Sequence, residues 1–598
     1  MTKTLPPYLW KAVVSLLLAG GMVAPSVEAA PRQPNVILVM TDDQGYGDVH
    51  AHGNTMIRTP HLDRLHAESV RLTNYHVDPT CSPTRSALLT GRYSTRTGVW
   101  HTIMGRSLMY RDEITVADVF SANGYRTAMF GKWHLGDNYP MRPQDRGFQE
   151  TLAIGGGGVT QTPDYWGNTY FDDTYYHNGK PEKFKGYCTD VFFDNALKFI
   201  EQNKAKRFFV YLPTNVPHGP YNVAEKYSKP YLDRGVPQPM ANFYGMIENL
   251  DENMGRLLAS LKQWGLEQDT VLIWTTDNGT AAGVSRPGGK SGKSGKGKNA
   301  PTGAQWTGFN AGMRAQKGSE YDGGHRVPLF IRWPAGGLGG GRDVTQLTAH
   351  LDMLPTLADL CGLKFTPRNP LDGRSLVPLL TGGARDWPAR TLFVHTQREE
   401  IPPKWTRSAA MTERWRLVNG KELYDMPADP GQTQDVSAQH AGVVAKLKED
   451  YEQWWASLQP AFTNYGYIVI GAEQENPALI TCMDWHAELV KDIPWNQEQI
   501  KSASWANGYW MIDVARAGRY EFTLRQQPAV AKFPLEASQA RVRVGQAEAT
   551  GAVPKGADGV KLTLKLAAGP SKLATWLTDE SSGKSRGAFF VEVRRVGE

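Results

Sequence analysis

Polar side chains that could bind a metal follow two short apolar runs of the sequence. The run NVILVMTDD ends at Asp42 and Asp43, and the run TVLIWTTDN ends at Asp277 and Asn278. Carboxylate and amide oxygens are the ligands that Ca²⁺ and Mg²⁺ prefer in proteins. An Asp-Asp pair alone more simply caps a turn, but a second oxygen-rich pair after another run favours a divalent metal site.

A cysteine lies at the predicted start of a helix in CSPTRSALLTG. Ser82 is a suitable N-cap, Pro83 suits the first helical position, and Gly91 would end the helix. Cys81 would then lie at a helix N-terminus that favours negative charge, with Arg85 one turn further on. The residues alone leave the thiol as packing, half of a disulfide, a metal ligand or a nucleophile with a lowered pKa. The spacings of the four cysteines fit no zinc motif, and one disulfide is possible without a choice of partners.

The apolar runs predict an α/β fold. They do not alternate with polar residues, which is typical of strands buried on both faces of a parallel sheet; they cover residues 35–43, 125–134, 207–218 and 270–278. Helical patterns lie between them, over 59–70, 189–204 and 241–265. Ligands bind at the carboxyl ends of strands in such sheets. Lys132, His134 and His218, which end two of the runs, should therefore meet the aspartates in one cleft.

The pattern changes after about residue 385. Strand patterns over 390–396 and 414–426, followed by a helical pattern over 440–458, predict a small α+β subdomain. From about residue 462, short strand patterns separated by Gly, Pro and Asn predict a β-sandwich module. The Gly-, Ser- and Lys-rich segment 283–303 is either a solvated insertion or a lid that attracts an anionic substrate.

Charge and the N-terminus exclude some classes of partner. A net charge of +6 is small for 598 residues, and no nucleic-acid motif occurs, so we expect no nucleic-acid binding. Lys3 and Lys11 precede an apolar run over 12–24, and small residues suit cleavage after Ala29. This run is short for a membrane span. We expect a bacterial exported protein, periplasmic or secreted, with no stable membrane span; an uncleaved N-terminal anchor is the alternative.

The segment CSPTRSALLTGRY resembles the signature of the type I sulfatases, an arylsulfatase-like family of the alkaline phosphatase superfamily. The resemblance continues in order from NVILVMTDDQGYGDV through AMFGKWHLG and NVPHGPY to ELYDMPADPGQTQDV, over roughly residues 35–458. It implies an alkaline-phosphatase-like, mostly parallel sheet flanked by helices, with a small α+β C-terminal subdomain. The expected divisions are a signal peptide (1–29), a catalytic domain (30–385), the subdomain (386–458) and a β-rich accessory module (462–598).

The resemblance also implies the chemistry. A maturation enzyme would oxidise Cys81 to Cα-formylglycine (3-oxoalanine), whose hydrate attacks the sulfur of a sulfate ester. The implied ligands of Ca²⁺, with Mg²⁺ as the alternative, are Asp42, Asp43, Asp277, Asn278 and the oxidised residue 81. The resemblance implies that Arg85, Lys132 and Lys317 offset the negative charge of the sulfate.

Proton transfer is assigned by the same resemblance. His218 with Lys317 would protonate the leaving group, and His134 would take a proton from the formylglycine hydrate. We add His101, Arg106 and His325 as candidates for the lining of the substrate pocket.

The motifs specify the sulfate ester and not the alcohol. Export, the basic segment and the β-rich tail favour sulfated glycans. The aromatics of the tail either form its core, which we favour, or stack on sugar rings; they include Trp485, Trp495, Trp505, Tyr509 and Trp510. The alternatives are a phosphonate monoester hydrolase or phosphodiesterase of the same superfamily, a catalytically silent carbohydrate-binding protein, and a cysteine hydrolase with a free thiol.

Overall fold

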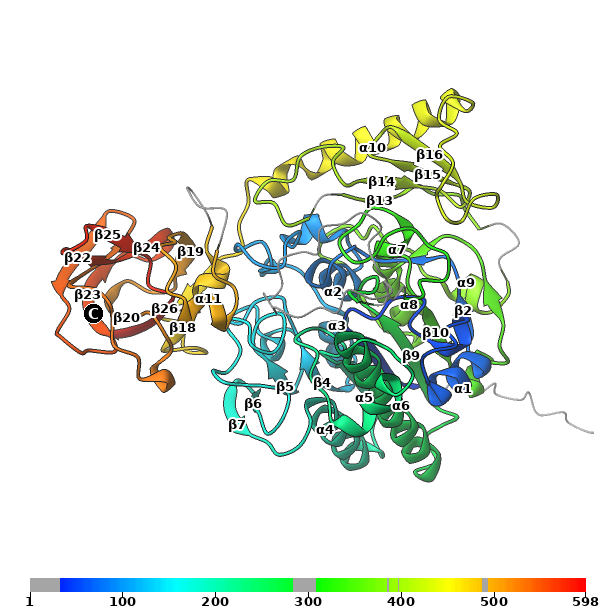
Figure 1. The fold of residues 1–598 in the computed structure, drawn as a ribbon, viewed down its shortest axis with the longest axis horizontal. Coiled ribbons are helices and arrows are strands. Elements are labelled where there is room, and N and C mark those ends of the chain that lie inside the picture. Colours follow the sequence, from blue (N-terminus) through cyan, green and yellow to red (C-terminus); the bar gives the residue numbers. More distant parts are fainter. Residues whose placement is uncertain (1–32, 283–307, 384–386, 396, 487–492) are drawn as a thin grey trace, which may run out of the picture.

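The computed structural model describes residues 33–282, 308–383, 387–395, 397–486 and 493–598 (Figure 1). The predicted signal peptide and the predicted segment 283–303 lie outside the described residues. In the part of the chain that is described, no helix is long and apolar enough to cross a membrane.

A ten-stranded sheet forms the centre of the largest domain, in the order β11-β2-β10-β9-β1-β8-β4-β5-β6-β7. Its middle is parallel: β1 (Asn35–Thr41) pairs with β8 (Phe208–Pro213) and β9 (Thr270–Thr276), and β8 pairs with β4 (Arg126–Lys132). These four strands are buried along nearly their whole length. The prediction of a parallel sheet from unalternating apolar runs is therefore confirmed.

The remaining strands extend this sheet on both sides. β10 (Leu329–Arg332) runs antiparallel to β9, and β5 (Glu150–Ile154) runs parallel to β4. The outer strands are β2 (Val70–Leu72), β11 (Asp343–Val344), β6 (Thr174–His177) and β7 (Lys180–Lys183).

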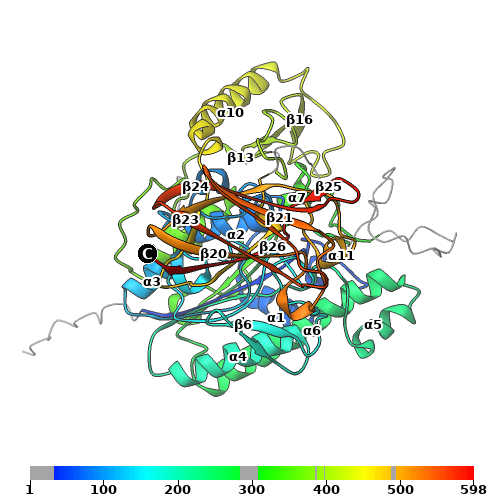
Figure 2. The same ribbon diagram turned by 90° about the vertical axis from the view of Figure 1, so that its left-hand side faces the viewer.

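Helices cover both faces of the sheet (Figure 1 and Figure 2). Alternate residues of β1 enter two different cores, Val36 and Leu38 into one, Ile37 and Val39 into the other. The first core contains residues of α2 (Cys81–Thr90), α3 (Val116–Ala122) and α8 (Met353–Leu360). The second contains residues of α1 (Pro60–Glu68), α4 (Cys188–Asn203) and α6 (Gln238–Gln263).

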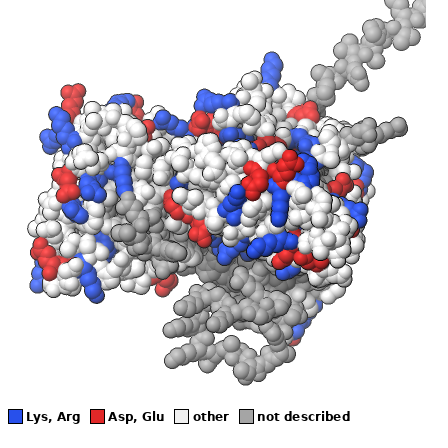
Figure 3. Space-filling model, turned by 90° about the horizontal axis from the view of Figure 1, so that it is seen from above, with Lys and Arg blue, Asp and Glu red and all other residues white. Residues whose placement is uncertain are grey.

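The predicted α+β subdomain packs beside this domain. Its antiparallel sheet consists of β13 (Leu392–Val394), β14 (Ala409–Met411), β15 (Trp415–Val418) and β16 (Glu422–Asp425). The long helix α10 (Ala441–Phe462) covers the sheet and ends four residues beyond the expected boundary at 458. On the face that carries α10, acidic and basic side chains are interspersed rather than gathered in one patch (Figure 3).

The C-terminal module is a sandwich of two sheets around one core. One sheet contains β17 (Ile468–Ile470), β19 (Tyr509–Val514), β24 (Gly569–Asp579), β21 (Gln539–Val544), β22 (Ala547–Ala552) and β25 (Lys584–Arg586). The other contains β18 (Ala478–Thr481), β26 (Phe590–Gly597), β20 (Gly518–Arg525) and β23 (Val560–Leu566). Trp485 and Trp510 are fully buried in this core, so for them the favoured core role is confirmed.

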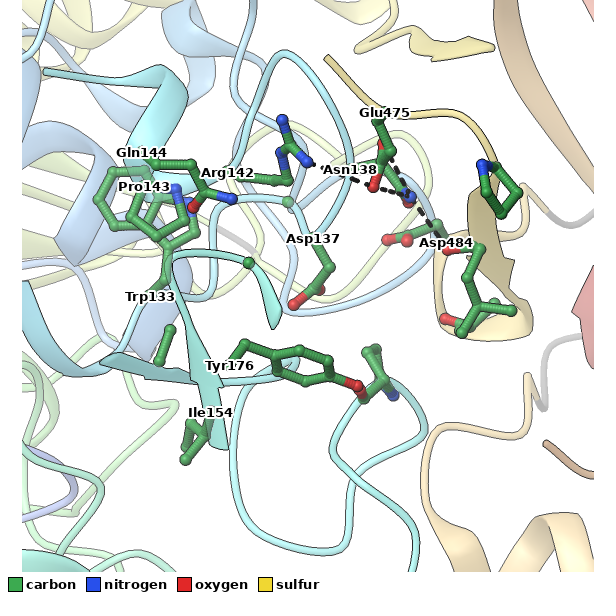
Figure 4. A pocket seen from close by; sticks show the side chains of 17 residues that line it. Trp133, Asp137, Asn138, Arg142, Pro143, Gln144, Ile154, Tyr176, Glu475 and Asp484 are labelled. Carbon is green, nitrogen blue, oxygen red and sulfur yellow. Dashed lines mark hydrogen bonds and ion pairs between the residues drawn. The ribbon is translucent and has the colours of Figure 1, made fainter. Parts of the chain in front are cut away.

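The module docks on the loop that follows β4, beside a cavity of about 230 Å³ (Figure 4). Glu475 accepts a hydrogen bond from the backbone N–H of Tyr139 at 2.8 Å, and its carboxylate lies 3.7 Å from Nη1 of Arg142. Asp137 lines the same cavity from the domain of the ten-stranded sheet, and Asp484 lines it from the module. Polar contacts as well as packing therefore hold the module in place.

Candidate active site

Cys81 begins helix α2 and is 2% exposed. The prediction that Ser82 is the N-cap is wrong. Thr80 is the capping residue, and the backbone N–H of Thr84 donates to its carbonyl at 3.3 Å. The hydroxyl of Ser82 instead donates to the carbonyl of His134 at 2.5 Å. Gly91 ends the helix as predicted, with a left-handed φ of 70°. No cysteine of the chain forms a disulfide, and all four are buried.

The carboxyl ends of β1 and β9 bring the predicted metal ligands together, as expected for neighbouring parallel strands. The backbone N–H of Asp43 donates to Asp277 Oδ1 at 3.1 Å, and Asn278 Nδ2 donates to Asp43 Oδ1 at 2.9 Å. Ligand atoms of Asp42, Cys81 and Asp277 lie within 4.8 Å of one another. Asp43 has a left-handed φ of 69°, a strained conformation of the kind that occurs at functional sites.

Three cations lie among these carboxylates. Lys132 Nζ donates to Asp42 Oδ2 at 2.6 Å, and Arg85 Nη2 donates to Asp277 Oδ2 at 2.8 Å, with all four side chains fully buried. Lys317 donates to Asp43. The structure therefore brings together all three cations that the sequence assigned to this cleft.

The electrostatics of the cleft favour an additional positive charge. Burial raises the pKa of Asp42 in spite of Lys132, and burial together with Asp42 raises the pKa of Asp277 to about 6. Asp43 differs, because Lys317, His218 and Lys132 together outweigh burial and hold its pKa well below the usual range. Two of the three carboxylates are thus not fully compensated by the cations of the chain.

Two oxygens of the cluster have no partner among the described residues. Asp42 Oδ1 and Asn278 Oδ1 are buried and accept no hydrogen bond. Each such group costs roughly 1–3 kcal/mol when it stays unsatisfied. Their position in a set of hard oxygen donors fits a divalent cation of the Ca²⁺ or Mg²⁺ class.

Two histidines face the same space with defined hydrogen-bonding roles. His134 Nε2 donates to the carbonyl of Thr102 at 2.8 Å, so its buried and unpartnered Nδ1 is an acceptor. Burial holds the pKa of His134 well below the usual range, and its backbone φ is 61°. His218 Nδ1 donates to the carbonyl of Gly219 at 2.7 Å, and its Nε2 lies 3.8 Å from Asp43 Oδ2. Both tautomers are assigned from these partners.

A pocket of about 220 Å³ opens over Cys81. Its lining residues are Cys81, His101, Thr102, Ile103, His134, Gln161, His218, Lys317, Arg398 and Trp495. The lining is rich in cations and imidazoles and suits an anionic ligand. The lysines act on the thiol too: burial raises the pKa of Cys81, but Lys132 and Lys317 outweigh it and lower the pKa overall.

The three candidate substrate residues lie in different places. His101 lines the pocket, where its Nδ1 accepts the backbone N–H of Thr102 at 2.7 Å. Arg106 lies outside the lining and pairs with Glu400 at 3.1 Å. His325 also lies outside, with its Nδ1 2.9 Å from that of His76; with Asp322 these two histidines form a separate buried cluster.

Sequence reasoning missed Gln161 and Arg398, and it noted Trp495 only as one aromatic of the tail. Gln161 accepts the backbone N–H of Gly157 at 2.8 Å and so shapes the loop above the histidines. Neither Gln161 nor Arg398 lies in a periodic pattern or in a motif. Their place in the pocket follows from how separate loops pack, which leaves no local signal.

Comparisons with known proteins agree with this geometry. Residues 34–363 match the family model described as Sulfatase, and residues 316–456 match the one described as N-sulphoglucosamine sulphohydrolase, C-terminal. The chain is 28% identical to Arylsulfatase A of Homo sapiens over 525 residues, which cover 78% of this chain and 95% of that protein. It is 29% identical to N-acetylgalactosamine-6-sulfatase of Mus musculus over 480 residues, which cover 74% and 83%.

A solved structure shares the fold as well. The crystal structure of Ps i-CgsB in complex with k-i-k-neocarrahexaose superposes with a TM-score of 0.60 at 27% identity, over 71% of this chain and 93% of that chain. Both family matches end at or before residue 456, ahead of the β-sandwich module.

Proposed function

The chain belongs to the sulfatase family and is a sulfuric ester hydrolase, and we propose that it removes sulfate from carbohydrates with a formylglycine formed from Cys81. The observation that carries the proposal is the position of Cys81, at a helix N-terminus between the carboxylate cluster and three cations, the buried Arg85 and Lys132 and the partly buried Lys317. Relatives named for N-acetylgalactosamine 6-sulfate and a similar structure with a bound neocarrahexaose support a carbohydrate as the alcohol.

The residues at the strand ends fit a divalent cation, for which we propose Ca²⁺, with Mg²⁺ as the alternative. Its ligands would be Asp42, Asp43, Asp277 and Asn278, with the oxidised residue 81. A cation bound there would supply positive charge against the sulfate oxygens. The unpartnered oxygens of Asp42 and Asn278 support this assignment.

The cations of the chain prepare the cleft for the sulfate group. Arg85 and Lys132 fix Asp277 and Asp42 through the contacts described above, and they add positive charge beneath the pocket floor. Lys317 lines the pocket itself, where its ammonium group would contact a sulfate oxygen. Such preorganised charge stabilises the negative charge that develops during S–O cleavage.

The two histidines have complementary proton-transfer geometry. One hydroxyl of the hydrated residue 81 would attack sulfur, and His134, which presents the acceptor Nδ1, would then take the proton of the second hydroxyl, so that sulfate leaves and the aldehyde is restored. His218 and Lys317 both line the pocket and would deliver the proton that the leaving sugar oxygen needs. The backbone carbonyls of Thr102 and Gly219 fix the orientation of the two imidazoles.

The division of the chain is part of the proposal. We assign a signal peptide to residues 1–29, the catalytic domain to 30–385, its subdomain to 386–458 and the accessory module to 462–598. The protein would be exported to the periplasm or secreted, and a formylglycine-generating enzyme would act on it.

The mass of the tryptic peptide Leu72–Arg85, from protein made in its own source, tests the nucleophile. We expect an aldehyde at position 81 and release of sulfate from sulfated sugars, with the Cys81→Ala variant inactive. A plain thiol in protein that still releases sulfate would contradict the formylglycine mechanism. Faster turnover of an aryl phosphonate than of every sulfate ester would favour the phosphonate hydrolase instead.

A further inference from the structure

The C-terminal module reaches the active site through the segment that begins helix α11 (Gln497–Lys501). The backbone N–H of Thr162 donates to the carbonyl of Trp495 at 2.8 Å, and that of Gln497 donates to the carbonyl of Thr160 at 2.9 Å. These bonds fasten the module to the 155–162 loop.

The 155–162 loop packs directly on both proposed proton-transfer residues. A Cβ at Gly157 would lie 2.2 Å from His134 Cε1, and one at Gly158 would lie 3.2 Å from His218 Nδ1. Only a residue without a side chain allows this approach at position 157. The module is therefore linked to both proposed proton-transfer histidines through this loop.

The opposite side of the pocket is also tied to the module. Glu400 accepts from Arg106 Nε at 3.1 Å, and its Oε1 lies 2.9 Å from Nδ1 of His486 in the module. Gln397 Nε2 donates to Asp78 Oδ1 at 2.9 Å, near the start of α2. The segment between these anchors contains Arg398, so its backbone is held at both ends.

Trp495 is the tryptophan of the module that lines the pocket. The residue is 38% exposed, and its backbone N–H donates to Gln499 Oε1 at 2.8 Å, which fixes its backbone at the start of α11. Trp485 and Trp510 contact each other in the core, Arg586 lies 3.9 Å above Trp505, and Arg541 lies 3.9 Å above Trp576. Within the described residues, no aromatic ring or cation covers the face of Trp495.

Arg398 supplies an uncompensated positive charge to the same pocket. The residue is exposed, its φ is 73°, and it forms no ion pair with any carboxylate in the described part of the chain. A guanidinium group binds carboxylate or sulfate oxygens through two parallel hydrogen bonds. When the scissile sulfate lies at Lys317 and residue 81, a simple alcohol sulfate has no second anionic group that could pair with Arg398.

We infer that Trp495 and Arg398 form a specificity wall that selects a saccharide with a second anionic group. Trp495 stacks on one face of the ring that carries the scissile sulfate, and Arg398 pairs with a carboxylate or a further sulfate on that sugar. The pocket of about 220 Å³ is below the roughly 300–1,000 Å³ of drug-sized sites and suits one ring. This inference rests on the proposed carbohydrate sulfatase function.

Defined sugars separate the possible second anions. The probes are methyl glycosides of N-acetylglucosamine, galactose and glucose with one sulfate at each position, the corresponding disulfated sugars, and glucuronic acid with one sulfate. We expect kcat/KM to be at least about tenfold higher for one of the two doubly anionic classes than for its monosulfated counterpart, one good ion pair being worth this much. Arg398→Met should reduce that preference to within about twofold, mainly through KM.

Matched substitutions distinguish a role of the specificity wall in substrate selection from damage to the fold of the module. Trp495→Leu should lower kcat/KM on the preferred sugar by about tenfold or more, while Trp495→Phe, which keeps a planar face, should restore most of it. Trp505→Leu and Arg407→Met are the controls, since both residues are exposed and lie outside the pocket lining. Thermal unfolding verifies that each variant is folded.

Failure of the inference and failure of the proposed function are distinguishable. If the wild-type protein releases sulfate from sugars but the Arg398 and Trp495 variants behave like their controls, the wall is refuted and the function stands. If Trp495→Phe loses as much as Trp495→Leu, stacking is refuted. If formylglycine-containing protein cleaves 4-nitrophenyl sulfate but no sugar sulfate, the proposed carbohydrate function itself fails.

Discussion

Two cavities flank the same loop after β4, and they differ in the ionisable groups that line them. His134 lines the pocket over Cys81, whereas Asp137, three residues later, lines the cavity where the module docks (Figure 4). The first cavity contains Lys317 and Arg398 together with three histidines. The second contains the carboxylates of Asp137, Glu475 and Asp484 and the guanidinium of Arg142.

This difference suggests that one cavity serves function and the other serves stability. In the proposed function the cationic pocket attracts a sulfate group, and its charges would serve binding and catalysis. The acidic cavity offers the same group no such excess of positive charge, and burial raises the pKa of Asp137 to about 6 and that of Glu475 to about 7. Substitutions in the pocket should therefore change activity with little effect on unfolding, and substitutions in the acidic cavity should do the reverse.

Replacement of Cys81 by alanine should have the largest effect. Removal of the nucleophile is expected to lower kcat by about 10⁶-fold, as for other enzymes that act through a covalent intermediate. The melting temperature should change little, because only one small buried atom is lost. Cys361→Ala is the matched control, since that thiol is equally buried and lies outside the pocket lining. Equal activity in the two variants would contradict the assignment of residue 81 as the nucleophile.

Removal of divalent metal should be next in size. Chelation is expected to reduce sulfate release by about 10⁴-fold or more, since the carboxylate cluster loses the charge that polarises the sulfate. Added Ca²⁺ should restore activity, and Mg²⁺ should restore less if the assignment of Ca²⁺ is right. Far-UV circular dichroism, followed in the same titration, should stay constant. Full activity in metal-free protein, verified by elemental analysis, would contradict the metal site.

His134→Ala should follow, with a loss of about 10²–10⁴-fold in kcat, the range for removal of a general acid or base. Nδ1 is the acceptor that the proposed reaction needs, and alanine removes it together with the bond to Thr102. His177→Ala serves as the control, because this histidine bonds Glu150 and Glu182 at the edge of the sheet. A loss in kcat accompanied by a large fall in melting temperature would mean that His134 supports the fold instead.

The strand-end residues were predictable from the sequence because parallel topology collects them at one edge. Asp42, Asp277 and Lys132 each follow an unalternating apolar run, and neighbouring strands β1 and β9 place two of them in contact range. The sandwich was equally predictable, since β23 (Val560–Leu566) alternates buried and exposed residues in a strict period of two. Periodicity and topology thus gave the fold and the floor of the site.

The walls of the site were not predictable in the same way. Arg398 and Gln161 lie in loops, where no period links a residue type to a direction. Trp495 reaches the pocket through contacts between residues more than 300 positions apart, such as the bond from Thr162. Ser82 looked like a helix cap, but the carbonyl of His134, distant in sequence, takes its hydroxyl.

Glu475→Gln should have the smallest effect, and it should appear in stability as a function of pH. Burial raises the pKa of Glu475 from 4.5 to about 7 in spite of Arg142, so the folded protein binds this proton more tightly than the unfolded chain does. The resulting stabilisation is fully present below about pH 4.5 and is lost as pH rises through about 7. Its full size is about 3 kcal/mol at about 1.4 kcal/mol per pKa unit.

Glutamine keeps an oxygen that can accept the N–H of Tyr139 but cannot ionise, so the variant should gain stability relative to the wild type between pH 5 and pH 8. Glu473→Gln is the control, because that carboxylate is 75% exposed and pairs with Arg516 at the surface. The measurement is the melting temperature of the three proteins across this pH range, with sulfate release unchanged in both variants. If the difference in melting temperature between Glu475→Gln and the wild type stays constant with pH, the cavity tolerates the ionised carboxylate. The acidic cavity would then have no pH-dependent effect on stability to contrast with the role of the pocket.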